Sequence, residues 1–177
     1  DPKKILHASK QKLLSVSGIG DAMISSIQDV KNENWLEKEV GNIRKHNASF
    51  IIDGDIPRAL HEIYDTPLGL YQRGTIPDGP YISIVGTRMP SLYAQKICQQ
   101  LSFNLAKKGF CIVSGMARGI DAIAHQAALD AKGKTIAFLG TGIDIIYPPE
   151  HLTLYQEIIS KGAVLSEFSF GRKADRR

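Results

Sequence analysis

From residue 81 onward, short apolar runs alternate with longer segments that have a helical period. The runs cover residues 81–85, 110–113, 135–139 and 163–166. Each is nearly continuously apolar, as expected for strands that are covered on both faces. Helical connections between consecutive parallel strands are right-handed. The pattern therefore predicts an α/β fold with a doubly wound, mostly parallel, Rossmann-like sheet.

Two of the intervening segments predict amphipathic helices. The first begins after Ser91, a favourable N-cap residue, and stops at Gly109. The second, at about residues 121–132, carries a stripe of small side chains that would let it approach the sheet closely. The stripe consists of Ile120, Ala124, Ala127, Ala128 and Ala131.

The chain before residue 81 has a different pattern. Residues 13–27 predict a helix, a glycine turn and a second helix, followed by a helix near 34–46 and a short strand at 50–52. We expect a small all-α helix-hairpin-helix domain (1–48), a connecting segment that joins the sheet (49–80) and a Rossmann-like domain (81–177). Such a hairpin either donates backbone N–H groups to a DNA phosphate or is a packed hairpin without a ligand. The sequence leaves both readings open.

Two predicted strand-to-helix turns contain both glycine and arginine. Glycines allow a phosphate to approach the backbone, a helix start offers unpaired N–H groups, and arginine adds a two-pronged charged contact. Both turns follow strands of a parallel sheet, so they would face the same crevice. The plainer alternative is tight connections with solvated arginines. The residues expected to bind phosphate are Gly86, Thr87, Arg88, Ser114, Gly115, Arg118 and Gly119.

A third loop, residues 140–151, leaves the next predicted strand and should overhang the same crevice. Its Tyr147 could stack on a nucleobase or pack under the neighbouring proline turn. The Gly140-x-Gly142 pair is not a complete Gly-x-Gly-x-x-Gly motif, and the other two turns lack that motif as well. This disfavours an NAD-binding site, and we expect no cofactor.

Charge is distributed unevenly along the 177 residues. Residues 1–80 hold 10 Lys and Arg against 11 Asp and Glu, whereas residues 81–177 hold 12 against 7. The basic half is the one with the glycine turns, which favours a polyanionic partner. The terminal residues Arg172, Lys173, Arg176 and Arg177 supply much of this excess.

Other sequence features narrow the class of protein. No apolar run reaches the roughly 20 residues of a membrane span, the start is not a signal peptide, and a cytoplasmic location is the default expectation. Cys98 and Cys111 fall on apolar faces and predict core positions. Asp121 and His125 have the i, i+4 spacing of an acid–base pair, but bracing of the turn explains them more simply, and no nucleophile is evident.

These features together resemble the DNA-processing protein A family, DprA/Smf. The resemblance covers nearly the whole chain, including a helical domain like the family's sterile-alpha-motif-like (SAM-like) module. It is carried by Ser-Ile-Val-Gly-Thr-Arg (83–88), Ser-Gly-Met-Ala-Arg-Gly-Ile-Asp (114–121) with His125, Lys-Thr-Ile-Ala (134–137), Gly-Ile-Asp (142–144), Tyr-Pro (147–148) and Leu-Ser-Glu-Phe (165–168), and upstream by Ile-Tyr-Asp-x-Pro-x-x-Leu-Tyr-x-Arg-Gly (63–74).

The resemblance implies a non-catalytic protein with an extended Rossmann fold. Such proteins bind single-stranded DNA, load the RecA recombinase onto it and displace single-stranded-DNA-binding protein during natural transformation of competent cells. They form homodimers through the Rossmann domain. Arg88 and the 114–119 turn are the first choices for phosphate contacts, with Lys134 as a basic neighbour and Tyr147 as a stacking residue.

The chain also departs from the family pattern. Pro149-Glu150-His151 stands where the family often has asparagine after Tyr-Pro-x-x. The chain stops where Phe-Pro-x-Arg-Asn-Arg would begin, so we expect the strands and helices that complete the fold, and a winged-helix domain, to be absent. The alternatives are a nucleotide-processing hydrolase of the lysine-decarboxylase-like, cytokinin-activating type, whose Pro-Gly-Gly-x-Gly-Thr marker is missing, a nucleotide-binding module or a structural interaction protein.

Overall fold

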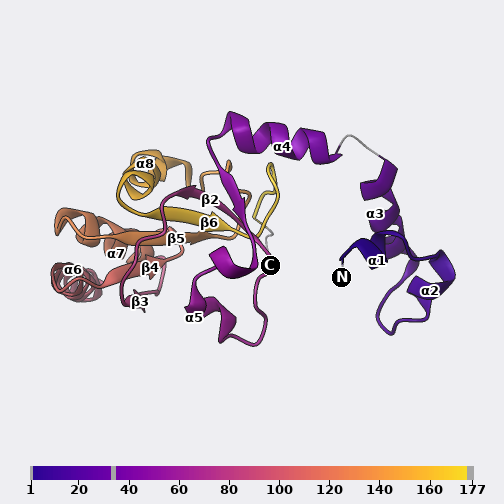
Figure 1. The fold of residues 1–177 in the computed structure, drawn as a ribbon. Helices are drawn as coiled ribbons and strands as arrows, with labels where there is room; N and C mark the ends of the chain where they lie inside the picture. The colour runs from indigo at the N-terminus through magenta and orange to yellow at the C-terminus, as the bar shows by residue number, and fades with distance from the viewer. Residues whose placement is uncertain (1, 33–34, 175–177) are drawn as a thin grey trace. The chain divides into compact units, whose positions relative to one another are not determined.

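The computed structural model describes residues 2–32 and 35–174, and Figure 1 shows its ribbon. The C-terminal residues 175–177, which include the predicted basic tail residues Arg176 and Arg177, lie outside the described residues, as does Asn34. The chain divides into two compact units, residues 1–42 and 43–177. No helix within the described ranges is long and apolar enough to cross a bilayer.

The first unit contains the predicted helix, glycine turn and helix. Helices α1 (Pro2–Leu6) and α2 (Lys10–Leu14) both contact α3 (Asp21–Asn32). The turn between α2 and α3 places Gly18 at φ +88°, a conformation that glycine adopts without steric cost. Leu13 and Ile24 are buried. Helix α4 (Trp35–Lys45) follows, close to the predicted position.

The second unit is built on a six-stranded sheet with the order β1-β2-β6-β5-β4-β3. Its parallel part consists of β3 (Tyr81–Ser83), β4 (Cys111–Ser114), β5 (Thr135–Leu139) and β6 (Ala163–Ser166). These are the four predicted strands, with small shifts at their ends. The α/β fold with a mostly parallel sheet is confirmed.

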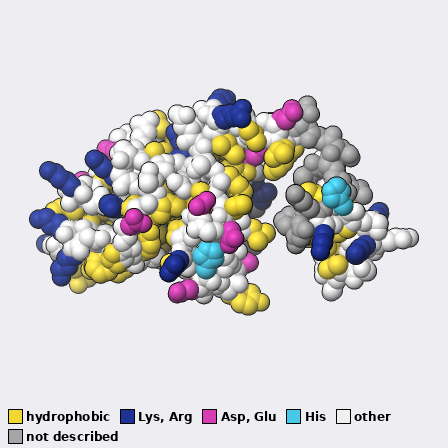
Figure 2. All heavy atoms as spheres, in the orientation of Figure 1, with side chains coloured by type: hydrophobic (Ala, Val, Ile, Leu, Met, Phe, Trp, Pro, Cys, Tyr) yellow, Lys and Arg dark blue, Asp and Glu magenta, His cyan; other side chains and the backbone are white. Residues whose placement is uncertain are grey.

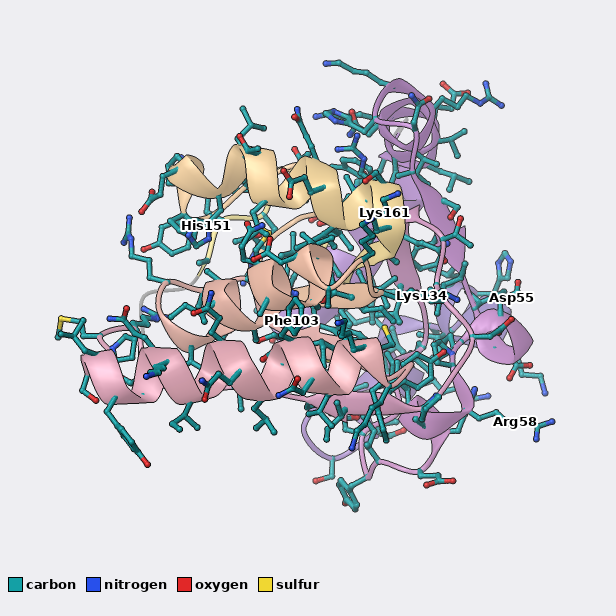
Figure 3. The ribbon with its side chains drawn as sticks, turned by 90° about the vertical axis from the view of Figure 1, so that its left-hand side faces the viewer. Asp55, Arg58, Phe103, Lys134, His151 and Lys161 are labelled. Carbon is teal, nitrogen blue, oxygen red and sulfur yellow. The ribbon has the colours of Figure 1, made fainter. Side chains whose placement is uncertain are left out.

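Three helices connect the parallel strands, and they lie side by side (Figure 3). They are α6 (Leu92–Lys107), α7 (Ile120–Asp130) and α8 (Leu152–Lys161), the last preceded by the short 3-10 helix η2 (Pro149–His151). Ser91 caps α6 as expected, because its Oγ accepts the Ala94 N–H at 3.2 Å.

All three connecting helices pack on one face of the sheet. The strands follow one another in a single direction from β3 to β6, and right-handed connections then place every helix on the same side. The other face packs against the segment around α5 (Arg58–His61), through Ile56 and Leu60. Within residues 43–174 the second helical layer of the predicted doubly wound sheet is therefore absent.

The connecting segment contains more strand than its pattern predicts. Besides β1 (Ser49–Ile51) and the 3-10 helix η1 (Asp53–Asp55), it forms β2 (Leu70–Gly74), which pairs antiparallel with both β1 and β6. The prediction missed β2 because only Leu70 and Tyr71 of its five residues are apolar. Both are buried, and Tyr71 packs edge-on against Phe170 at a centroid distance of 5.3 Å.

Candidate nucleic-acid interface

The two arginine-containing turns touch one another at the carboxyl ends of β3 and β4. The Ile120 N–H at the start of α7 donates to the Thr87 carbonyl at 3.2 Å. Gly119 has φ +79°, and a Cβ there would overlap the Thr87 carbonyl oxygen and the Arg88 backbone. Only glycine allows this approach, so Gly119 brings the Arg88 turn against the Arg118 turn.

Arg88, Arg118 and Tyr147 line one pocket at this edge. Its volume of about 130 Å³ lies well below the roughly 300–1,000 Å³ of typical small-molecule sites. It therefore suits one phosphate-sized group better than an enclosed nucleotide. The lining residues are Arg88, Gly115, Ala117, Arg118, Leu139, Gly140, Thr141, Tyr147 and Ala174.

The Arg118 guanidinium has two partners from the third loop. Its Nε donates to Glu150 Oε1 at 2.6 Å, and its Cζ lies 6.0 Å from the centre of the Tyr147 ring. The hydrogen bond and charge of Glu150 raise the pKa of Arg118, and the same contact lowers the pKa of Glu150. Arg118 and Glu150 side chains are each 52% exposed. The sequence identifies Glu150 only as a departure from the family pattern and does not predict this ion pair.

The polar groups beneath the pocket are largely occupied within the protein. Asp121 Oδ2 accepts the Gly115 N–H at 3.1 Å and the Ala117 N–H at 3.4 Å. Ser114, which is buried, donates its hydroxyl proton to the Ile84 carbonyl at 2.6 Å. The Gly115 amide and the Ser114 hydroxyl thus make bracing contacts within the protein, and a phosphate contact by either residue stays a prediction. Positive charge at the pocket comes from the guanidinium groups.

Thr87 and Gly86 also brace the first turn. Thr87 Oγ1 accepts the Met89 N–H at 3.2 Å. Gly86 faces the Ile120 side chain, which would lie 2.8 Å from an added Cβ. These two residues hold the backbone that carries Arg88, whose own side chain is exposed.

Hydrogen bonds hold the third loop against the end of the sheet. Its carbonyl groups accept three short bonds, from Ser166 Oγ to Thr141, from the Tyr155 hydroxyl to Ile143 and from Thr141 Oγ1 to Ile145. Tyr147 precedes a cis peptide bond to Pro148 and is 48% exposed. The proline is buried while the tyrosine ring stays available at the pocket.

Lys134 lies at the amino ends of the parallel strands, at the end of the sheet opposite the pocket. It precedes β5, whereas Gly140 follows that strand and lines the pocket, a separation of about 20 Å at the rise of a β-strand. Figure 3 shows Lys134 and Lys161 at one end of the three helices and His151 at the other. His151 marks the pocket end, because its Nδ1 lies 3.0 Å from the Met116 carbonyl. The structure thus separates Lys134 from the other predicted site residues.

Basic side chains gather at that opposite edge, at the left of Figure 2, over α6, α7 and α8. Positive charge at the carboxyl end of a helix complements the helix dipole. This accounts for their position without a ligand. The lysines at or just beyond the three helix ends are Lys107, Lys108, Lys132, Lys134 and Lys161.

His125 is fully buried and braces the sheet. Its Nδ1 lies 2.6 Å from Thr135 Oγ1, whose proton goes to the Ile112 carbonyl at 2.7 Å, so the histidine Nδ1–H is the donor. Burial, with a smaller contribution from His151, lowers the pKa of His125 to about 3. Asp121 and His125 therefore have separate bracing contacts instead of forming an acid–base pair.

The buried histidine predicts a pH-dependent stability. Below pH 6.5 the unfolded protein protonates His125 and the folded protein does not, so its stabilising contribution is lost as the pH falls toward 3. Between pH 7 and pH 5 the free energy of unfolding should fall by about 2 kcal/mol more in the wild type than in His125→Gln, which keeps an N–H donor. Urea unfolding at both pH values measures this, and equal pH dependence in the two proteins would contradict it.

The site has no evident metal-binding group. Among residues 2–32 and 35–174 no cluster of three or more His, Cys, Asp or Glu side chains could hold an ion. Arg88 and Arg118 line the pocket between the loops.

Comparison with protein families decides the affiliation of the chain. The family described as DNA recombination-mediator protein A matches residues 47–177. The chain belongs to this family. The DprA/Smf resemblance of the motifs is confirmed.

Relatives of this DNA recombination-mediator family match most of the chain. Protein Smf of Synechocystis is 39% identical over 173 residues, which cover 91% of this chain and 42% of the relative. DNA processing protein DprA of Streptococcus pneumoniae is 39% identical over 147 residues, 80% of this chain and 52% of the relative. The chain thus spans about half the length of these curated relatives.

Two solved DprA structures share the fold. The X-ray structure from Streptococcus pneumoniae is 32% identical, has a TM-score of 0.76, and covers 90% of this chain and 56% of that one. The structure from Helicobacter pylori is 33% identical, has a TM-score of 0.64, and covers 73% and 59%. It is described as giving insight into that protein's single-stranded DNA binding mode.

Proposed function

We propose that this chain binds single-stranded DNA across the pocket formed by the three loops. The observation that carries the proposal is that Arg88 and Arg118, 30 positions apart, line the same pocket at the carboxyl edge of the sheet. Two guanidinium groups beside a small pocket suit successive phosphates of a chain. The single-stranded DNA binding described for the Helicobacter pylori relative supports the same ligand class.

Each site residue has a proposed role. Arg88 and Arg118 contact phosphates, and Gly119 holds their turns together. Tyr147, half-exposed beside Arg118, stacks on a base, which contributes about 1–3 kcal/mol in single-stranded complexes. Gly86, Thr87, Ser114 and Gly115 shape the loops. We assign Lys134 no contact in this groove, because it lies at the other edge of the sheet.

We propose further that the protein acts without catalysis as a recombination mediator. In this role it would deliver single-stranded DNA to RecA, displace single-stranded-DNA-binding protein and work as a homodimer through the Rossmann domain, in natural transformation. The family's description as a recombination mediator supports the role. The partners follow from the resemblance of the motifs.

Salt-dependent binding distinguishes this proposal from a nucleotide-processing hydrolase or nucleotide-binding module. Fluorescence anisotropy with a labelled thymidine 20-mer should show an affinity that falls steeply with salt, by a logarithmic slope of about 0.7 for each phosphate contacted. Duplex DNA of the same length should bind more weakly. Tight 1:1 binding of thymidine monophosphate with little salt dependence would instead favour a nucleotide site, and hydrolysis of that ligand would favour the enzyme.

A further inference from the structure

One residue beside the pocket, bonded to its Arg118, opposes the proposed ligand. Glu150, in η2, places a carboxylate 2.6 Å from Arg118 Nε, where a phosphate oxygen of DNA would bind. In the free protein this carboxylate satisfies the arginine as an anionic ligand would. Arg88 has no ion pair among the described contacts, so the two guanidinium groups differ in their availability.

The ion pair is weak enough to be opened. Both side chains are 52% exposed. Exposed pairs of this kind contribute little, because water screens them and both long side chains lose freedom. Glu150 therefore does not block Arg118, but any phosphate that takes its place must displace a carboxylate and then lie beside a negative charge.

We propose that Glu150 is a specificity-determining residue, which holds Arg118 in the free protein and favours chains of phosphodiesters over small phosphates. The inference rests on the proposed function. A phosphodiester carries one negative charge, whereas a terminal phosphate carries about 1.5 to 2 at pH 7 and is repelled more strongly by Glu150. A DNA chain also keeps its contact with Arg88 while Glu150 is displaced. A mononucleotide is too short to add contacts beyond the pocket.

The test compares Glu150→Gln with Glu157→Gln, which removes the same charge from an exposed position on α8 outside the pocket. The probes are a thymidine 20-mer with a free 5′-hydroxyl, read by anisotropy, and thymidine 5′-monophosphate as its competitor. Glu150→Gln should raise 20-mer affinity on the order of threefold, within the range of an exposed ion pair. The affinity of the monophosphate should rise more, about tenfold, and Glu157→Gln should change neither.

The same measurements in an Arg118→Ala background distinguish a failure of the role proposed for Glu150 from a failure of the proposed DNA site. There the effect of Glu150→Gln on the 20-mer should fall to that of Glu157→Gln. An undiminished effect, or a gain for the monophosphate no larger than that for the 20-mer, would overturn the role of Glu150. If Arg118→Ala alone leaves 20-mer affinity unchanged, the proposed DNA site itself is wrong.

Discussion

Replacing Arg88 and Arg118 together by alanine should weaken the binding of a thymidine 20-mer about 100-fold at moderate salt. Hydrogen bonds to charged groups contribute about 1.5–3 kcal/mol each, and every tenfold change in affinity corresponds to about 1.4 kcal/mol. The salt slope should also fall by about 1.4, or 0.7 for each lost phosphate contact. Loss of affinity should be uniform across base sequences, because phosphate contacts do not read bases. Anisotropy titrations at several salt concentrations measure both quantities.

The matched control for this experiment is Arg58→Ala. Arg58 is exposed at the start of α5, and Figure 3 shows it far from His151 at the pocket end. Loss of one positive charge there, half of what the double variant loses, should change affinity less than twofold, since distant charges are screened by salt. If the Arg88, Arg118 double variant binds as well as Arg58→Ala does, phosphate binding at this pocket is refuted.

Gly119→Ala should destabilise the protein by about 3 kcal/mol and weaken DNA binding at the same time. A sparsely populated backbone conformation costs a residue with a Cβ about 1–3 kcal/mol, and Gly119 has φ +79° and ψ −126°. The added methyl group would also overlap the Thr87 carbonyl and the Arg88 backbone, neither of which is a flexible side chain. The two arginine turns must then move apart. Thermal unfolding and 20-mer titrations report the two effects.

Gly109→Ala is the control that carries a conformational cost without the steric overlap. Gly109 has φ +90°, but nothing lies within 4 Å of a Cβ placed there. In Gly109→Ala the free energy of unfolding should fall only by the conformational cost of about 1–2 kcal/mol. The affinity for DNA should be unchanged. Equal destabilisation of the two variants, or unchanged DNA binding by folded Gly119→Ala, would show that contact between the turns does not organise the site.

Most of the parallel part of the sheet could be predicted because β4, β5 and β6 are buried along nearly their whole length. Residues 135–139 and 163–166 are nearly continuous apolar runs, and the loop after the first of them contains Gly142, where the backbone of Ser169 approaches closely. The meeting of Arg88 and Arg118 followed from one topological rule, that carboxyl ends of parallel strands share an edge. Strand β2 could not be found in this way, because only two of its five residues are apolar and its partner β6 is about 90 residues away in the chain.

The details of the site depended on side-chain partners that spacing does not reveal. A helix start after Gly119 predicts free N–H groups, but Asp121 folds back and accepts two of the loop amides. Glu150 reaches Arg118 across 32 positions of sequence. Lys134 is adjacent to β5, but it precedes the strand. It therefore lies at the amino end of β5, whereas the pocket lies at the carboxyl end. The sequence feature that could have revealed this pair is the acidic side chain of Glu150 in a loop whose other residues suit an anion.

A crystal structure of the protein with a short thymidine oligonucleotide tests the central claim most directly. We predict phosphate oxygens within about 3 Å of both the Arg88 and the Arg118 guanidinium groups, with the Glu150 carboxylate turned away from Arg118. An oligonucleotide bound along the edge formed by Lys132, Lys134 and Lys161, with both arginines free of phosphate, would contradict it.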